Sequence, residues 1–240
     1  MFSKKISIKQ AEFNSAMDKY HTHSIYQSTN KLVSVLNVCM QIVLFGLLFN
    51  LIISWHWYLI SFVIGYFITD FINGIVHMYM DNNDNYDSIF GPFIASFHLH
   101  HKKPKYKDNN LLLVYFNESG SKFWLVPCLL MTLYLYYLQI NPIILVILIY
   151  IGILSSIAEV SHYLCHNSYS KTVLLLQNMH ILLSTTHHSS HHKKDNEKYA
   201  FLNGMSDYLI DWIAKKYYKG YKNGTDRHFE YYCGIDTKNR

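Results

Sequence analysis

Charged residues are missing from two long, strongly apolar stretches of the chain. Residues 32–69 and residues 123–158 contain no Lys, Arg, Asp or Glu. A helix needs about 20 residues to cross the ~30 Å hydrocarbon core of a bilayer, so each stretch is too long for one crossing and suits a hairpin of two. Polar residues near the middle of each stretch mark the turns: Asn50 in the first, and Asn141 with Pro142 in the second. The pattern therefore predicts four membrane spans.

The expected fold is all-α: an integral-membrane four-helix bundle of two hairpins, with a histidine-rich cap on its cytoplasmic side. The expected spans are residues 33–53, 58–78, 123–139 and 143–163. The expected divisions of the chain are a cytoplasmic N-terminal segment (1–31), a membrane domain (32–204), and an interfacial amphipathic helix with a polar tail (205–240). A soluble helical core is the alternative, and two charge-free runs of this length disfavour it.

The basic residues indicate how the bundle is oriented. Lysines concentrate in the N-terminal segment, in the central loop around residues 102–107 and in the tail, whereas the two hairpin tips have no Lys or Arg. The positive-inside rule then predicts that all three lysine-rich segments face the cytoplasm. No signal peptide is evident in the first thirty residues. We expect a multi-pass protein of the endoplasmic reticulum in a eukaryote, or of the cytoplasmic membrane in a bacterium.

Composition narrows the class of protein further. Half of the 240 residues are apolar and 15% are charged, against about 25% charged in ordinary soluble domains. This excludes a disordered chain and a disulfide-stapled secreted miniprotein. The four cysteines lie far apart with no CxxC spacing, and we expect them to be reduced and structural. The net charge of +5 is mild, so no nucleic-acid partner is expected.

The chain has 15 histidines, and most fall in groups with the spacing of metal sites. Residues three or four apart on a helix share a face, so such pairs can bind one cation, and neutral imidazole is a favoured ligand for iron, zinc and copper. The candidate metal ligands are His77, His100, His101, His162, His180, His187, His188, His191 and His192.

Two carboxylates belong to the same candidate site. Asp81 shares a helical face with His77, and Glu159 shares one with His162. An ionisable residue at the end of an apolar span is costly to place, so a functional role is the default interpretation. Both carboxylates are therefore candidate catalytic residues of the site.

The histidines from His180 to His192 cannot all reach one metal from a continuous helix, because they point in different directions. Two metals would accommodate them, or the helix breaks near residues 184–186, where hydroxyl side chains are good N-caps. A labile metal-buffering loop is an alternative reading of the HHSSHH run, and zinc hydrolysis needs fewer ligands. Many histidines above a hydrophobic bundle are the layout of iron-dependent membrane desaturases and hydroxylases.

Four motifs in one order carry a more specific resemblance. Residues 70–77 read D-x-x-x-G-x-x-H, residues 97–104 read F-x-x-H-H-x-x-P, Ser161 and His162 match the S-H that ends a third element, and residues 176–192 read LQxxH-x6-HHxxHH. From about Asp70 to Gly204 the chain resembles the Kua-type lipid desaturase family, which includes plasmanylethanolamine desaturase and the plastid phosphatidylglycerol trans-desaturases. Histidines of the family pattern fall here on Asn110, Ala158 and Asn196, with Glu159 and His166 as the nearest substitutes.

The resemblance implies an oxidoreductase: a membrane-bound non-haem di-iron desaturase that introduces a C=C bond into a lipid chain. It implies two histidine-bound irons, with Asp81 as an outer or substrate-facing carboxylate and Glu159 as a substitute ligand. It also implies O2 as oxidant and two electrons from a carrier such as cytochrome b5 or ferredoxin. Plasmanyl ether lipid converted to vinyl ether plasmalogen is the first choice of substrate. An acyl-lipid desaturase, a lipid hydroxylase and a catalytically decayed membrane binding or regulatory protein are the alternatives.

Overall fold

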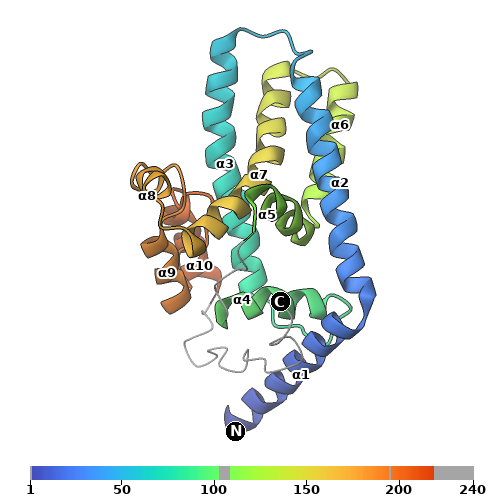
Figure 1. The fold of residues 1–240 in the computed structure, drawn as a ribbon, viewed down its shortest axis with the longest axis vertical. Coiled ribbons are helices and arrows are strands. Elements are labelled where there is room, and N and C mark those ends of the chain that lie inside the picture. The colour runs from blue at the N-terminus through green and yellow to red at the C-terminus, as the bar shows by residue number, and fades with distance from the viewer. Residues whose placement is uncertain (1, 103–108, 195, 219–240) are drawn as a thin grey trace.

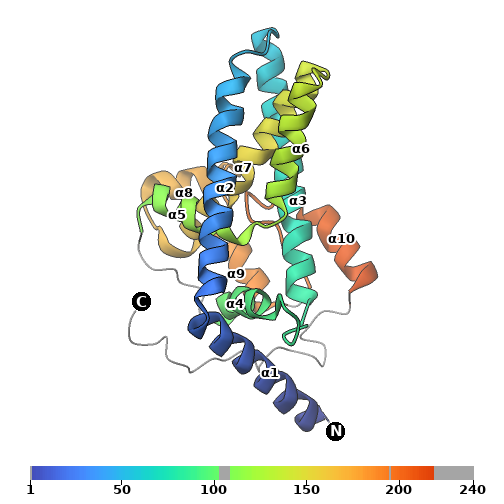
Figure 2. The ribbon, with the colours of Figure 1, turned by 90° about the vertical axis from the view of Figure 1, so that its right-hand side faces the viewer.

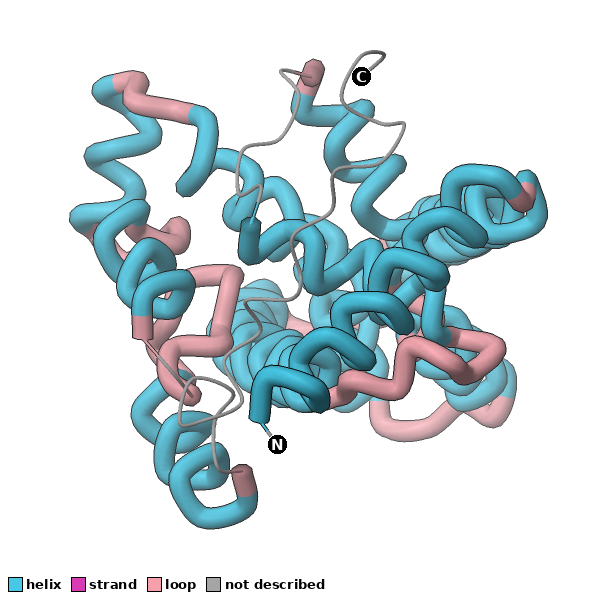
Figure 3. Tube along the Cα trace, turned by 90° about the horizontal axis from the view of Figure 1, so that it is seen from below, coloured by secondary structure: helices cyan, strands magenta, loops and turns pink. Residues whose placement is uncertain are grey.

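A computed structural model describes residues 2–102, 109–194 and 196–218, and these form helices joined by loops, with no strand in the described ranges (Figures 1 and 3). The lysine-rich loop at 103–107 and the polar tail beyond 218 lie outside the described residues. The helices are α1 (Phe2–Thr22), α2 (Ser24–Leu48), α3 (Trp55–Asn82), α4 (Gly91–Lys102), α5 (Leu111–Glu118), η1 (Ser119–Ser121), α6 (Leu125–Tyr137), α7 (Pro142–Asn167), α8 (Lys171–Asn178), α9 (Thr185–Lys193) and α10 (Asp207–Tyr217).

Three helices are long and apolar enough to cross a membrane. They are α2, α3 and α7, with 25, 28 and 26 residues. At 1.5 Å per residue their lengths are about 37–42 Å, more than the ~30 Å hydrocarbon core. They correspond to the predicted spans at 33–53, 58–78 and 143–163. The prediction of a membrane protein therefore agrees with the structure for these three segments.

The fourth predicted span, residues 123–139, is shorter than expected. Helix α6 has 13 residues, about 20 Å of helix, which does not reach across the hydrocarbon core. It packs between α2 and α7, where Leu125 and Leu129 join Leu44 and Ile149 in one apolar cluster. Directly before the helix the chain forms η1 and buries the Lys122 side chain. The described residues thus contain three full-length candidate spans and one short apolar helix.

Both predicted turns lie at the same end of the molecule, opposite α4, α9 and α10 (Figures 1 and 2). The first turn comprises residues 49–54. At the second, Asn141 caps α7 by accepting a hydrogen bond from the Ile143 N–H at 2.9 Å, and Pro142 occupies the first turn of the helix. Proline suits this position because its missing N–H would have no partner there. The sequence markers of both turns are confirmed.

Three residues of the D-x-x-x-G-x-x-H motif on α3 have three different tasks. The Asp70 carboxylate accepts hydrogen bonds from the backbone of residues 202–206 and so anchors that loop. Gly74 lets α10 approach, since a Cβ there would lie 2.3 Å from Ile210 Cδ1 and 3.1 Å from the Ala200 backbone. His77, one turn further on, faces the histidines described below.

Helix α10 is amphipathic, as predicted, but its apolar residues divide between two faces. Ile210 and Ala214 are buried against α3 and residues 199–200. Tyr208 and Trp212 point away and are 92% and 58% exposed. The helix therefore packs on the body of the protein, and its position in a membrane interface stays a prediction.

Candidate metal centre

Helices α3, α4, α7 and α9 converge at the end of the molecule opposite the two turns and bring two groups of metal-ligating side chains together. The first cluster, as we call it, is His100, His162, His166, His188 and His192. The second cluster is His77, Asp81, His101 and His191. In each cluster the candidate ligand atoms all lie within 4.8 Å of one another.

In the first cluster the ring nitrogens face a common point. His188 Nε2 lies 2.8 Å from His162 Nε2 and 3.0 Å from His192 Nε2. The rings of His100 and His166 complete the group, with their centroids 4.9 Å apart. Five imidazoles from three helices thus surround one position, which is a ligand set suited to a divalent transition metal.

The second cluster is built around a fully buried carboxylate. Asp81 Oδ1 lies 2.9 Å from His101 Nε2, and Oδ2 lies 3.4 Å from His77 Nε2 and 3.2 Å from His191 Nε2. All these side chains are at most 8% exposed. Asp81 is thus placed among the candidate ligands, whereas we expected it outside them.

The remaining nitrogens of this cluster are held by the backbone. His77 Nδ1–H donates to the Tyr199 carbonyl at 2.6 Å, and His191 Nδ1–H donates to the Glu197 carbonyl at 2.8 Å. These bonds fix the tautomer that leaves both Nε2 atoms toward Asp81. Metal-ligating histidines are held in this way, with one nitrogen on the metal and the other on a carbonyl or carboxylate.

Helix α9 serves both clusters because the chain breaks before it. Ser184 caps α9 by accepting a hydrogen bond from the His187 N–H at 3.1 Å, so the predicted break near residues 184–186 is confirmed. Within α9, His188 and His192 point into the first cluster and His191 into the second. One short helix therefore links the two sites.

Burial disfavours the charged form of two imidazoles in the first cluster that lie outside the spans. Burial and the neighbouring His162 hold the pKa of His100 and of His188 well below the usual value. Burial also lowers the pKa of His191, but Asp81 outweighs it, so the net shift is upward. Neutral imidazole is the form that binds metal, and a carboxylate beside an imidazole completes a cation site.

Buried polar atoms that lack a hydrogen-bond partner are a second sign that these residues suit bound metal ions. His188 Nδ1, His191 Nε2 and Asp81 Oδ2 are buried atoms without a hydrogen bond in the part of the chain described. Buried polar atoms are normally satisfied, and a bound cation would satisfy the two in the second cluster. Three histidines and a carboxylate there, and five histidines in the first cluster, are ligands that transition-metal ions take in proteins.

A comparison with models of known protein families shows which family the chain belongs to. The lipid desaturase domain matches residues 66–218, which is more than half of the chain. The chain belongs to the lipid desaturase family. Comparisons with curated proteins and with solved structures gave no match.

Three predicted site residues of this family member lie outside both clusters. His180 is exposed, with a positive φ of 56°, and its carbonyl accepts a bond from Asn203. His187 Nε2 lies 2.6 Å from Asp207 Oδ2. Glu159, expected as a substitute ligand, instead pairs with Lys122 at 2.8 Å. We therefore leave these three residues out of the proposed ligand set.

His166 lies in the first cluster. We named it above as a nearest substitute for a missing family histidine, although it was not in the main list of candidate ligands. The signal was its i, i+4 spacing from His162 on α7, which puts both rings on one face. The positions where the family pattern has histidines have other tasks here. Asn110 caps α5, Ala158 packs in an apolar cluster, and Asn196 bonds the Ala214 and Tyr218 carbonyls.

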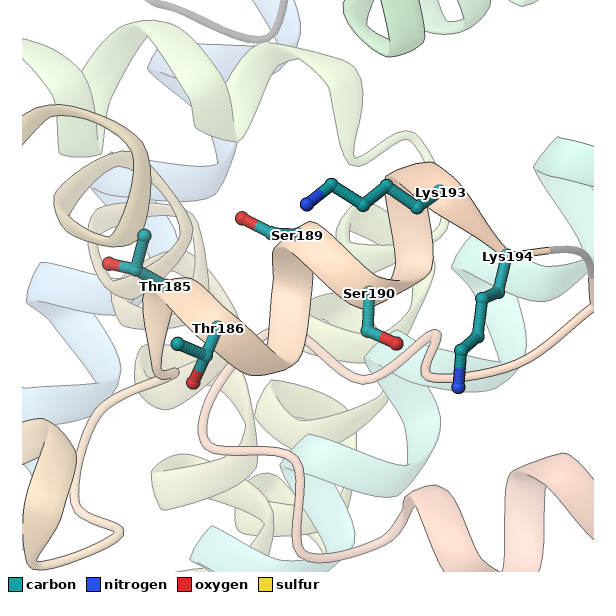
Figure 4. Close-up of a pocket in the computed structure, with 6 residues that line it drawn as sticks. All are labelled: Thr185, Thr186, Ser189, Ser190, Lys193 and Lys194. Atoms are coloured by element: carbon teal, nitrogen blue, oxygen red, sulfur yellow. The ribbon is translucent and has the colours of Figure 1, made fainter.

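The outer face of α9 is unrelated to the metal centre. Hydroxyl and lysine side chains line a shallow pocket of about 410 Å³ there (Figure 4). Its lining residues are Thr185, Thr186, Ser189, Ser190, Lys193 and Lys194. The sequence of α9 thus separates inward histidines from an outward polar surface.

Proposed function

We propose that this protein is a membrane-bound lipid desaturase with two histidine-bound irons. The first iron would be held by the five histidines of the first cluster, and the second by His77, Asp81, His101 and His191. The observation that carries the proposal is the pair of adjacent clusters, both served by α9, in a chain of the lipid desaturase family. Bound iron would supply the O2 chemistry and the removal of hydrogen from an unactivated carbon, which no side chain here provides.

The overall reaction balances with the expected co-reactants. Two hydrogen atoms leave adjacent lipid carbons, and a C=C bond forms. O2 accepts these together with two electrons from a carrier and two protons, and two water molecules result. A cytochrome b5 or ferredoxin is the carrier we propose, reaching the clusters from the cytoplasmic side, in the endoplasmic reticulum of a eukaryote or the plasma membrane of a bacterium.

The chain's own residues would hold the metals and keep water away from them. His77 lies between the aromatic rings of Phe97, Tyr199 and Phe201, at centroid distances of 5.5, 5.8 and 5.4 Å. These rings shield the second cluster from solvent. A dry site protects a reactive centre from side reactions.

The depth of the clusters supports a substrate bond near the lipid head group. Trp57 is suited to the interface at the far end of α3, and His77 lies 20 residues further along the same helix. Twenty residues span about 30 Å, the thickness of the hydrocarbon core. The second cluster would then meet the first carbons of a lipid chain. The 1-O-alkyl chain of a plasmanyl lipid, desaturated to a vinyl ether, fits this depth.

The test is a lipid mass-spectrometric assay for acid-labile vinyl ethers. The chain is expressed in cells that make alkyl ether lipids but lack their own desaturase, beside the variants His191→Ala and His180→Ala. We expect vinyl ethers from the wild type and from His180→Ala, and none from His191→Ala. Vinyl ethers absent from inserted, iron-loaded wild type would exclude the plasmanyl substrate, and unchanged product in His191→Ala would exclude the site.

A further inference from the structure

Lys122 is a buried cation at the edge of the second charge-free stretch. Its side chain lies in the loop between η1 and α6, and the residue is 3% exposed. The ammonium lies 2.8 Å from Glu159 Oε1 on α7, donates to Asn73 Oδ1 on α3, and sits 4.8 Å from the centre of the Phe201 ring. A buried charge is costly unless it is paired. Here Glu159 pairs it, and the position of that carboxylate suggests what the ion pair does.

Glu159 connects this lysine to the first cluster. While Oε1 pairs with Lys122, Oε2 lies 3.9 Å from His162 Nδ1, one turn further along α7. The other nitrogen of that ring, Nε2, faces His188 Nε2 in the cluster at 2.8 Å. The two nitrogens of His162 therefore have separate neighbours: a carboxylate on one side and the candidate metal position on the other.

The second cluster shows why a carboxylate is placed here. There, backbone carbonyls of residues 197 and 199, which lie outside helices, hold the outer nitrogens of two histidines. His162 lies within α7, where nearby carbonyls accept helical hydrogen bonds. A side-chain acceptor has to take their place, and Glu159 at i−3 is on the correct face.

We propose that Lys122 and Glu159 form a positioning ion pair that orients His162 and strengthens metal binding in the first cluster. Glu159 Oε2 lies 3.9 Å from His162 Nδ1 and would accept its N–H once the ring turns to a bound metal, while Lys122 holds the carboxylate in place. Neither residue is a metal ligand. The inference rests on the proposed function in one respect, that the first cluster binds iron.

The test is an anaerobic Fe(II) titration of the purified, metal-free full-length protein in detergent. Removing an outer partner of a ligating histidine typically weakens metal affinity about 10–100-fold. We expect Glu159→Gln to weaken one of the two bound irons by about this factor and to leave the other unchanged. Lys122→Met should have the same effect.

A double variant separates positioning from folding. Lys122→Met alone leaves a buried carboxylate unpaired and can fail to fold, whereas Lys122→Met with Glu159→Gln removes both charges, a change that folded proteins tolerate. We expect the double variant to fold, to bind one iron with the affinity of the wild type, and to bind the other about 10–100-fold more weakly. Gln41→Leu is the matched control, because Gln41 is a buried polar residue that bonds α7 at Gly152 and Ser156 without touching a histidine of either cluster.

The measured affinities distinguish a positioning role of the ion pair from a purely structural one. Wild-type affinity for both irons in the double variant, or equal loss in Gln41→Leu, would show that the pair is only structural and would overturn the inference. The proposed function would survive that result. A wild type that binds no iron would overturn both.

Discussion

Asp70→Asn should destabilise the protein strongly, because one carboxylate anchors a whole loop. Oδ1 accepts the N–H groups of Leu202, Asn203 and Gly204 at 3.2, 3.0 and 3.3 Å. Oδ2 accepts the N–H and the hydroxyl of Ser206 at 2.9 and 2.6 Å. In Asp70→Asn one of the two oxygens becomes an NH2 group, which cannot accept a hydrogen bond from a backbone N–H, and the negative charge is lost from the bonds that remain.

The magnitude follows from the bonds lost. A hydrogen bond to a charged group contributes about 1.5–3 kcal/mol, so losing the Ser206 N–H bond and the charge behind the other four bonds costs about 3–6 kcal/mol in the free energy of unfolding. For a chain of this size about 1 kcal/mol corresponds to roughly 2–4 °C, so the melting temperature should fall by roughly 10 °C.

The assay is thermal unfolding of the purified protein in detergent with a chelator present, so that metal binding does not contribute. Ser206→Ala is the control, because it removes only the hydroxyl bond to the carboxylate and should cost about 1.5–3 kcal/mol. A melting temperature of Asp70→Asn equal to that of Ser206→Ala would refute the reasoning.

Two further predictions concern packing and pH. Gly74→Ala should lower the melting temperature, because the new Cβ would lie 2.3 Å from Ile210 Cδ1 and would also meet the Ala200 backbone. Such overpacking costs about 1–3 kcal/mol. Gly46→Ala is the control and should not lower the melting temperature, because a Cβ there would have no neighbour within 4 Å. Burial and the nearby Glu159 raise the pKa of Glu118 from 4.5 to about 7. The folded state then binds this proton more tightly than the unfolded state, so stability is lost as pH rises from 4.5 to 7. Glu118→Gln should remove this loss, about 2–3 kcal/mol, in melts compared at pH 5 and pH 8, and an unchanged pH dependence would contradict the assignment.

Much of the fold was predictable because membrane spans are a local signal. The charge-free runs predicted the three long helices α2, α3 and α7. Asn141 and Pro142 predicted the start of α7. The length of α6 was not predictable from the same pattern. The helix starts after Lys122, which pairs with Glu159 37 residues later in the chain, and no local periodicity records such a contact.

The candidate site was predictable as a set of residues but not as an arrangement. Spacing on one helix indicated pairs such as His188 and His192, and the structure places both in the first cluster. Spacing could not show which cluster each histidine joins, because α4, α7 and α9 meet only through tertiary packing. For the same reason the central position of Asp81 and the exposure of His180 required the structure.

The most direct test of the central claim is the iron content of the purified protein. After expression with added iron, the wild type and His180→Ala should each hold about two irons per chain, one for each cluster. A variant with His188→Ala, His191→Ala and His192→Ala removes ligands from both clusters and should hold none. Iron absent from the wild type, or retained by the triple variant, would contradict the account.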